Sequence, residues 1–244
     1  MRTLILILFL TVMTDLSQAF EIPQTCRQLI VGTTKHWDSS EVLVQRWERQ
    51  DSGKWKRVGS RWKGRIGRDG AAWGLGLHPG IPFGPTKKEG DGRAPAGVFQ
   101  IGNAYGYAPG IIKKPSLVYH QVTERDLWVE DSTSKYYNRH LQLTERPPQT
   151  PWELQAQMRL DDPAHALKLF IAHNAPPNAV PGAGSAIFFH IWRRGGDAPT
   201  SGCTVQEKKY LETLIAWVDP SESPLYVLLP KEVYSRFRED WQLP

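Results

Sequence analysis

Two stretches near the C-terminal end decide the fold, Ala186-Ile-Phe-Phe-His-Ile-Trp192 and Thr200-Ser-Gly-Cys-Thr204. The first is an apolar run whose residues alternate between the two faces of a predicted strand, with His190 near its end. The second places Cys203 thirteen residues after His190. A thiol that follows a strand-borne imidazole this closely indicates a cysteine acyl-transfer site, with Cys203 as nucleophile and His190 as general base.

A helix is predicted to begin immediately after the thiol. Thr204-Val-Gln-Glu207 has the pattern of a capping box, and Leu211, Leu214, Ile215 and Val218 follow as an apolar stripe. In that arrangement the free N–H groups and the positive end of the helix dipole stabilise a thiolate. The same N–H groups, with that of Cys203, are predicted to hold the oxyanion of a tetrahedral intermediate.

The rest of the chain is predicted to be rich in strands. Alternating or apolar runs indicate strands at residues 28–31, 42–47, 55–58, 98–101, 166–173 and 224–229. Residues 103–150 are predicted to be mostly loop, with strand pieces at 118–120 and 127–129. Thr150-Pro-Trp-Glu153 starts a helix that is expected to run to about residue 160. The sum is a β-dominated α+β domain.

Length and composition fit one globular domain. The 244 residues are 40% hydrophobic and 23% charged, with a formal net charge of +5. The basic residues are scattered and no aromatic RNA-binding motif is present, so we expect no nucleic-acid partner. A modestly basic protein is instead drawn to anionic surfaces such as cell-wall polymers.

The N-terminus predicts export. Arg2, the apolar run Leu4 to Met13 and the small-x-small pattern Ser17-Gln-Ala19 together form a signal peptide over residues 1–19. The apolar run is shorter than the ~20 residues that span a bilayer, so no membrane span is expected after cleavage. Residues 20–244 then form a single mature domain in the periplasm or cell envelope.

The two cysteines leave one alternative open. Cys26 and Cys203 are the only cysteines in the chain, and in an oxidising compartment they are able to form a disulfide. Such a bridge would remove the nucleophile. We interpret Cys26 as a structural thiol, because the surroundings of Cys203 are far more specific.

Several motifs resemble those of the L,D-transpeptidase (YkuD-type) catalytic domain family. Phe189-His190 followed by Thr200-Ser-Gly-Cys-Thr204 is similar to the active-site signature of that family, a strand histidine, a loop and then Ser/Thr-x-Gly-Cys. Lys88 to Gly102 resembles its Thr-Pro-x-Gly-x-Phe block. Further similarity to an exported bacterial branch lies in Ala72-Trp-Gly-Leu-Gly-Leu-His-Pro79, Tyr136-Tyr-Asn-Arg139, His173-Asn174 and Pro181-Gly-Ala-Gly184. The resemblance spans roughly residues 28–230.

The resemblance implies a fold and a reaction. The fold would be a YkuD-like mixed β-sandwich or barrel, with a helix following the catalytic cysteine and a large lid-like insertion within residues 103–184. Members attack peptidoglycan stem peptides at the bond between an L-centred diamino acid and D-alanine, forming a cysteine thioester that an amine resolves. Cys203 would be the nucleophile and His190 the base, with Gly202, Ser201 and Thr204 lining the oxyanion side. No cofactor and no metal site are expected.

The sequence departs from the family pattern beside the cysteine. Ser201 stands where the commoner motif has a second histidine, and no Arg or Asn follows the cysteine closely. Recognition of the substrate carboxylate must then come from elsewhere. The candidates are Arg193, Arg194, Arg93 and Lys88, with His173 as a further residue near the site.

Three alternatives to transpeptidation stay open. Water in place of the amine would make the protein an L,D-carboxypeptidase or endopeptidase, because acceptor choice depends on cleft shape and water exclusion. A degenerate site would make it a non-catalytic wall-binding protein. A disulfide-stapled domain would have no thiol chemistry. The sequence also leaves the oligomeric state unknown.

Overall fold

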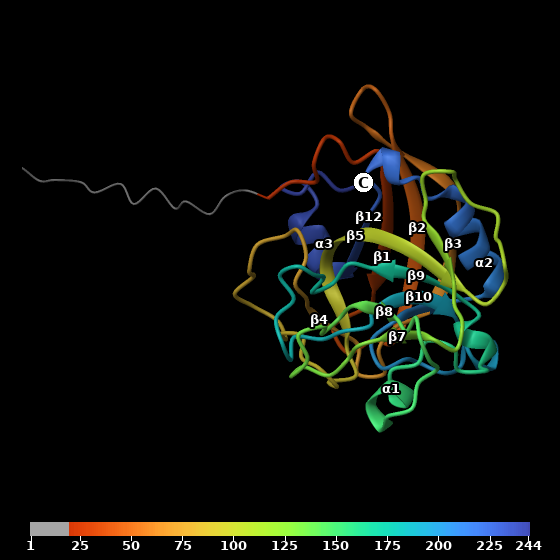
Figure 1. The fold of residues 1–244 in the computed structure, drawn as a ribbon. Coiled ribbons are helices and arrows are strands. Elements are labelled where there is room, and N and C mark those ends of the chain that lie inside the picture. The colour runs from red at the N-terminus through yellow and green to blue at the C-terminus, as the bar shows by residue number, and fades with distance from the viewer. Residues whose placement is uncertain (1–19) are drawn as a thin grey trace, which may run out of the picture.

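The computed structural model describes residues 20–244 (Figure 1). The predicted signal peptide, residues 1–19, lies outside the described residues. The strands are β1 (Gln28–Thr34), β2 (Glu41–Arg49), β3 (Trp55–Arg65), β4 (Ala71–Trp73), β5 (Ala94–Gly106), β6 (Tyr119–Gln121), β7 (Asp126–Trp128), β8 (His140–Gln142), β9 (Leu167–Ile171), β10 (Phe188–Ile191), β11 (Thr204–Gln206) and β12 (Leu225–Pro230). The helices are α1 (Pro151–Gln155), α2 (Lys208–Trp217) and α3 (Lys231–Phe237), with short 3-10 turns η1 (Pro163–His165), η2 (Arg194–Gly196) and η3 (Pro220–Glu222).

The main sheet closes on itself. Its strands follow the order β12-β1-β2-β3-β11-β10-β9-β5, and β5 also pairs with β12. This second pairing joins the two ends of the row, which makes the sheet a barrel and leaves it without a free edge at that point. The prediction of a β-dominated α+β fold with a barrel-like sheet is therefore confirmed, and each predicted strand overlaps an observed one.

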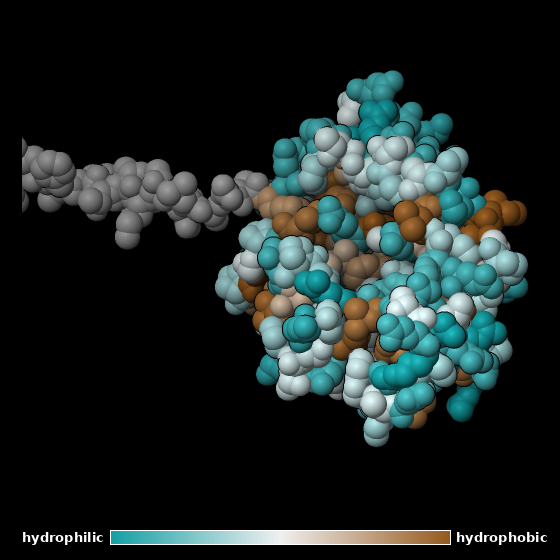
Figure 2. All heavy atoms as spheres, in the orientation of Figure 1, coloured by the Kyte–Doolittle hydropathy of each residue, from teal (hydrophilic) through white to brown (hydrophobic). Residues whose placement is uncertain are grey.

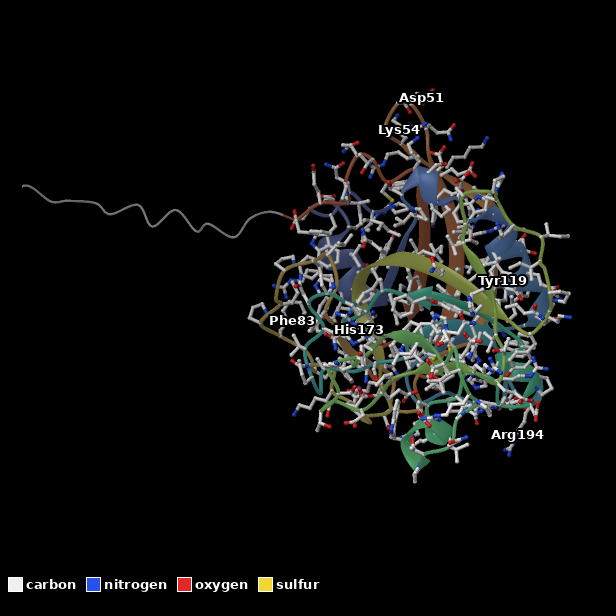
Figure 3. The ribbon with its side chains drawn as sticks, viewed as in Figure 1. Asp51, Lys54, Phe83, Tyr119, His173 and Arg194 are labelled. Atoms are coloured by element: carbon white, nitrogen blue, oxygen red, sulfur yellow. The ribbon has the colours of Figure 1, made fainter. Side chains whose placement is uncertain are left out.

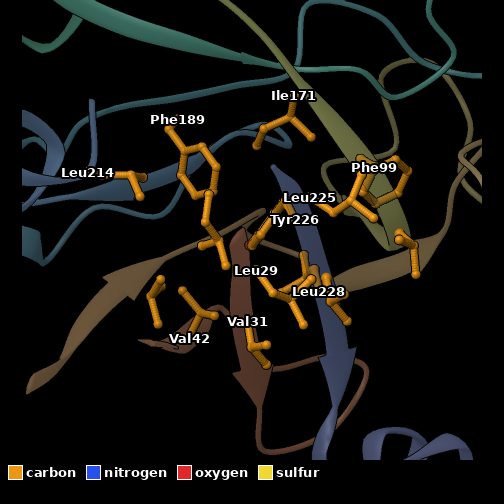
Figure 4. Packing of buried hydrophobic residues seen from close by; sticks show 14 of the residues in the cluster. Leu29, Val31, Val42, Phe99, Ile171, Phe189, Leu214, Leu225, Tyr226 and Leu228 are labelled. Atoms are coloured by element: carbon orange, nitrogen blue, oxygen red, sulfur yellow. The ribbon is translucent and has the colours of Figure 1, made fainter. Parts of the chain in front are cut away.

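The barrel interior is a packed apolar core rather than a channel. Figure 4 shows aromatic and branched side chains from several strands meeting there. Phe189 of β10 contacts Tyr226 of β12 with ring centroids 4.6 Å apart, and both side chains are almost fully buried. Residues of β10 that do not face this core face the opposite side of the sheet, where the candidate site lies.

The helix after the cysteine begins later than predicted. Residues 204–206 form β11, which pairs with β10 and β3, and α2 starts only at Lys208. The prediction of a capping box at Thr204 is therefore wrong. Tertiary pairing overrides the local pattern, because Thr204 meets the Tyr226 hydroxyl at 3.1 Å in the buried core. The predicted apolar stripe is correct, and Leu211, Leu214 and Ile215 are buried.

The inserted segment is shorter than the predicted 103–184. β9 belongs to the barrel between β10 and β5, so the insertion runs only from the end of β5 to η1. It contains β6, the β7–β8 hairpin and α1. Figure 1 shows the hairpin beside β9 and β10, with α1 at the lower edge of the molecule. α1 begins with the predicted capping box at Thr150 but ends at Gln155, before the expected residue 160.

Among residues 20–244, no helix has the length and apolar character needed to cross a bilayer. On the face in Figure 2, apolar side chains gather in a hollow near β5, and hydrophilic side chains surround it.

Candidate active site

The register between β10 and β11 puts the thiol and the imidazole on one face of the sheet. The strands are parallel and pair Phe189 with Thr204 and His190 with Val205. Cys203 precedes β11 and continues this register opposite Phe188, to whose N–H its sulfur is bonded at 3.4 Å. Diagonal neighbours on one face of a sheet lie about 7–8 Å apart, within reach of long or aromatic side chains.

Cys203 lies in an apolar environment. Its side chain packs against a cluster formed by Tyr105, Val122, Trp128, Met158 and Phe188. Its sulfur also donates to the Ala186 carbonyl at 3.4 Å. Burial raises the pKa of the Cys203 thiol to about 11, although the Lys168 ammonium acts in the opposite direction. The thiol is therefore protonated at neutral pH in this conformation.

This result overturns the prediction of an easily ionised thiol. The argument depended on a helix beginning directly at Cys203, whose dipole would lower the thiol pKa. Because β11 separates Cys203 from α2, the free N–H groups of that helix are not at the sulfur. Desolvation then has the largest effect on the pKa of the Cys203 thiol, and it raises that pKa.

His190 is held in the tautomer that a base requires. Its Nδ1 lies 2.9 Å from the Ile191 carbonyl oxygen. A carbonyl only accepts, so Nδ1 carries the proton and Nε2 keeps its lone pair. Burial lowers the pKa of His190 to about 4, which keeps the ring neutral at pH 7. The ring of His165 stacks on it at 4.8 Å.

Within residues 20–244 no hydrogen bond joins His190 to Cys203. The sulfur accepts from the N–H of Phe188 and donates to the carbonyl of Ala186, and Nδ1 of the imidazole donates to the carbonyl of Ile191. The two groups share a face but are not paired in this conformation. Such contacts commonly tighten only when substrate binds.

The turn before Cys203 is closed by Thr200. Its hydroxyl donates to the Cys203 carbonyl at 2.6 Å and accepts from the Gly202 N–H at 3.0 Å. The N–H of Cys203 has no protein partner in the described part of the chain, so it is available to an oxyanion. A Cβ at Gly202 would lie 3.0 Å from the Arg93 carbonyl oxygen, which shows how closely the two segments approach.

Ser201 and Thr204, the other two residues predicted to line the site, point in different directions, Ser201 to solvent and Thr204 into the barrel. Ser201 is exposed and accepts a hydrogen bond from Arg68 at 3.3 Å. Thr204 directs its hydroxyl to Tyr226 inside the barrel, on the face opposite Cys203. The prediction that the Thr204 side chain lines the site is therefore wrong, because alternation along β11 turns it away.

The predicted substrate cations lie in different places. Arg193 is bonded to Asp162 at 2.6 Å and lies 2.9 Å from the Nε2 atom of His165, the ring that stacks on His190. Arg194 is exposed at the edge of the molecule in Figure 3. Arg93 directs its guanidinium to Asp38 at 2.7 Å, and Lys88 is exposed. Only Arg193 contacts a neighbour of His190.

The side chain of His173 joins two loops by hydrogen bonds. It is fully buried, accepts from the Leu75 N–H at 3.1 Å through Nδ1, and donates through Nε2 to the Ala183 carbonyl at 3.0 Å. Burial lowers its pKa to about 4. Both ring nitrogens are used to join loops, and Figure 3 places the residue far from Arg194. None of its hydrogen bonds reaches Cys203 or His190.

Sequence reasoning missed Lys168. It pairs with His190 across β9 and β10, and its ammonium lies 5.6 Å from the Phe188 ring and donates to the Met158 carbonyl at 3.1 Å. Burial lowers the pKa of Lys168 to about 8. The signal in the sequence was a single charge within the apolar strand Leu167-Lys-Leu-Phe-Ile171.

Sequence reasoning also missed Asn138, which attaches the β7–β8 hairpin to the site. Its amide oxygen accepts from the Trp128 indole at 2.9 Å and from the Ala186 N–H at 3.0 Å. Its amide nitrogen donates to the carbonyls of His173 and Asn174. Trp128 is thereby held against Phe188, with ring centroids 4.7 Å apart. The hairpin covers the side of the sheet that carries Cys203.

Both cysteines are free. Cys26 is fully buried in the main core, and its sulfur donates to the Gln28 carbonyl at 3.2 Å. Burial raises its pKa to about 12. Cys203 belongs to a separate cluster, so the alternative of a disulfide between the two is not supported.

Comparison with known proteins gives one match. The model of the L,D-transpeptidase catalytic domain, YkuD, matches residues 47–227. This range includes β5, the inserted segment, β10, the turn at Cys203 and β11. No curated protein and no solved structure matches the chain.

Proposed function

Because the chain belongs to the L,D-transpeptidase catalytic-domain (YkuD) family, we propose that it is a peptidoglycan acyltransferase with Cys203 as nucleophile and His190 as general base. The substrate is a stem peptide with an L-centred diamino acid followed by D-alanine. The observation that carries the assignment is the shared face of Cys203 and His190, with Nε2 of His190 unprotonated.

The first half-reaction breaks the amide before D-alanine. Nε2 of His190 takes the proton of the Cys203 thiol while the sulfur attacks the carbonyl carbon of the diamino acid. The resulting oxyanion accepts a hydrogen bond from the Cys203 N–H, and one such donor contributes roughly 3 kcal/mol in measured cases. The intermediate expels the amine of D-alanine, which receives the proton from His190, and a thioester remains.

The second half-reaction reverses these roles. The side-chain amine of another stem peptide attacks the thioester carbon, and His190 removes the proton that the amine gives up. The thiolate of Cys203 leaves and recovers this proton. The net change is one amide broken and one amide formed, so no outside energy source is needed.

Raised thiol and lowered imidazole pKa values make proton transfer coincide with attack. With pKa values of about 11 for Cys203 and about 4 for His190, a thiolate–imidazolium pair is strongly disfavoured before substrate arrives. We infer that the covered conformation is a resting state. The Lys168 ammonium lowers the pKa of the Cys203 thiol and so favours negative charge at the sulfur.

The cover over Cys203 favours an amine over water as acceptor. The sulfur lies among Trp128, Met158 and Phe188, and such apolar walls limit hydrolysis of a thioester. We therefore place transpeptidation ahead of the carboxypeptidase and endopeptidase alternatives. Arg193 and Arg194, in the loop between β10 and β11, are the cations that we propose for the substrate carboxylate, because Arg193 contacts His165, whose ring stacks on His190. We further propose export to the periplasm or cell envelope, where this substrate lies.

A muropeptide assay tests the assignment. Wild-type protein lacking residues 1–19 is incubated with a disaccharide-tetrapeptide, and products are separated and weighed by mass spectrometry. We expect release of D-alanine and a cross-linked dimer. Cys203→Ala should abolish both, whereas the matched Cys26→Ala variant should keep them because its thiol lies in the main core.

The product pattern separates the alternatives. Trimmed tripeptide without dimer would replace transpeptidation by hydrolysis. Unchanged turnover in Cys203→Ala would overturn the assigned nucleophile. Absence of turnover in folded wild type, together with no covalent carbapenem adduct on Cys203, would favour a wall-binding protein.

A further inference from the structure

We infer that His120, Asp126 and His140 form a binding site for a divalent zinc-class metal ion, which joins the β7–β8 hairpin to the barrel. No metal was expected from the sequence, because these three residues are spread over twenty-one positions without a compact metal motif. The fold brings one ligand atom of each residue within 4.8 Å of the other two.

The two imidazoles converge on one carboxylate oxygen. Nε2 of His120 lies 2.6 Å and Nε2 of His140 lies 2.7 Å from Oδ1 of Asp126. Two imidazole nitrogens and one carboxylate oxygen are a donor set that zinc accepts, with a solvent molecule completing a tetrahedron. Tetrahedral ligands at the usual zinc distances are about 3.3 Å apart, so the cluster must open by roughly 0.6 Å to admit the ion.

A second layer of contacts orients the carboxylate. Asp126 is fully buried, and its Oδ2 accepts from both the N–H and the hydroxyl of Thr123 at 2.7 Å. This fixes Oδ1 as the oxygen that faces the two rings. Outer contacts of this kind are typical of metal ligands.

The histidines need only change tautomer to bind the ion. Nε2 of each must present its lone pair, so the ring proton moves to Nδ1. Nδ1 of neither ring has a protein partner within residues 20–244, and both side chains are partly exposed, at 29% and 21%, so water can accept that proton. A hollow of about 670 Å³ is lined by Gln121, Thr123 and Gln142, which are near neighbours of the ligands in the chain.

The ligands come from separate elements. His120 is on β6, which pairs with β5 of the barrel, whereas Asp126 and His140 are on the two strands of the hairpin. Trp128, which faces His140 across the hairpin, packs on Phe188. A bound ion would therefore restrain the hairpin that covers Cys203.

Zinc titration of the full mature chain tests the site. Binding is measured by calorimetry and by metal analysis after dialysis. Both measurements use wild type and Cys203→Ala, because the second protein cannot bind zinc through the Cys203 thiolate. We expect one ion per chain with micromolar or tighter affinity. His120→Gln and His140→Gln should each weaken it at least tenfold, and the exposed His36→Ala is the matched control that should bind as wild type does.

A second readout locates the effect. Hydrogen exchange of residues 122–143 should slow when zinc is added to wild type, and this protection should be absent in Asp126→Asn. Thermal unfolding in the presence of a chelator checks that each variant is folded without metal. If Asp126→Asn does not fold, His120→Gln replaces it in the exchange experiment. Absence of zinc binding in wild type, or equal affinity in His120→Gln, His140→Gln and His36→Ala, would overturn the site and leave a hydrogen-bonded cluster.

Discussion

The imidazole of His190 is buried and the thiol of Cys203 is half-buried, and both groups are neutral because the protein withdraws them from water. The imidazole lies on β10 and the thiol directly before the adjacent strand β11. Desolvation shifts their pKa values in opposite directions, to about 11 for the thiol and about 4 for the imidazole. At the scale of single residues, the protonation states of these two groups therefore distinguish a resting site from a reacting one. In the reaction that we propose, substrate binding must bring Nε2 of His190 to the sulfur of Cys203 before the proton can move.

Thiol alkylation measures this protonation state. Because only the thiolate reacts, the iodoacetamide rate at Cys203 should rise about tenfold per pH unit from pH 7 to pH 9, with no plateau. Mass spectrometry of the peptide that contains Cys203 gives the rate, and the more deeply buried Cys26 should remain unlabelled. A plateau below pH 8 would contradict the raised pKa.

The β7–β8 hairpin is the element that decides access to the site. It contributes Trp128, which is 6% exposed and lies against Phe188, Phe170 and Tyr105. Asn138 fixes the hairpin to the backbone of residues 173, 174 and 186. Covering the thiol with apolar rings both raises its pKa and excludes water.

Removal of the indole should open the site. We expect Trp128→Ala to lower the free energy of unfolding by about 3–5 kcal/mol, because a large buried side chain is lost. Cys203 should alkylate faster, and a larger share of thioester should be hydrolysed. Urea unfolding, alkylation and the muropeptide assay give the three values.

The matched control is Trp152→Ala in α1. Trp152 belongs to the same insertion but is 46% exposed, so its loss should change stability by less than about 1 kcal/mol. Equal alkylation rates in Trp128→Ala and wild type would mean that the indole does not limit access.

The closed barrel makes the whole molecule sensitive to acid. It buries His173 and His190 as neutral rings, with pKa values of about 4 in the folded state against an ordinary 6.5. A folded pKa below the unfolded one means that the unfolded chain binds more protons. The stability that these rings contribute is complete above pH 6.5 and is lost as the pH falls toward 4.

Chemical denaturation at two pH values tests this dependence. Between pH 7 and pH 5, each of the two histidines should lower the free energy of unfolding by about 2 kcal/mol. His190→Gln should remove its share of the pH dependence while His36→Ala keeps the wild-type slope. A pH-independent urea midpoint over this range would show that the rings are not buried in the neutral form.

Local patterns were sufficient for much of the molecule. The alternation in residues 186–192 predicted β10, and the apolar stripe after Cys203 predicted the buried face of α2. The Thr-Ser-Gly-Cys run and its distance from His190 pointed to the family that the comparison then gave. The strand and the helix stripe are visible in one sequence because each depends on the periodicity of neighbouring residues, and the family followed from the resemblance of these motifs to a known signature.

Only the tertiary structure decided the start of α2, the pKa of Cys203 and the cluster around Asp126. Thr204 to Gln206 read as a helix cap, yet pairing with β3 and β10 made them a strand. That pairing removed the helix dipole from the thiol, and Trp128, from a hairpin more than sixty residues earlier, belongs to the apolar cluster against which the thiol packs. The amino-acid sequence by itself determined which groups are present and which face of β10 its residues occupy. Burial, charge and the meeting of distant ligands depend on long-range packing, and no local pattern contains that information.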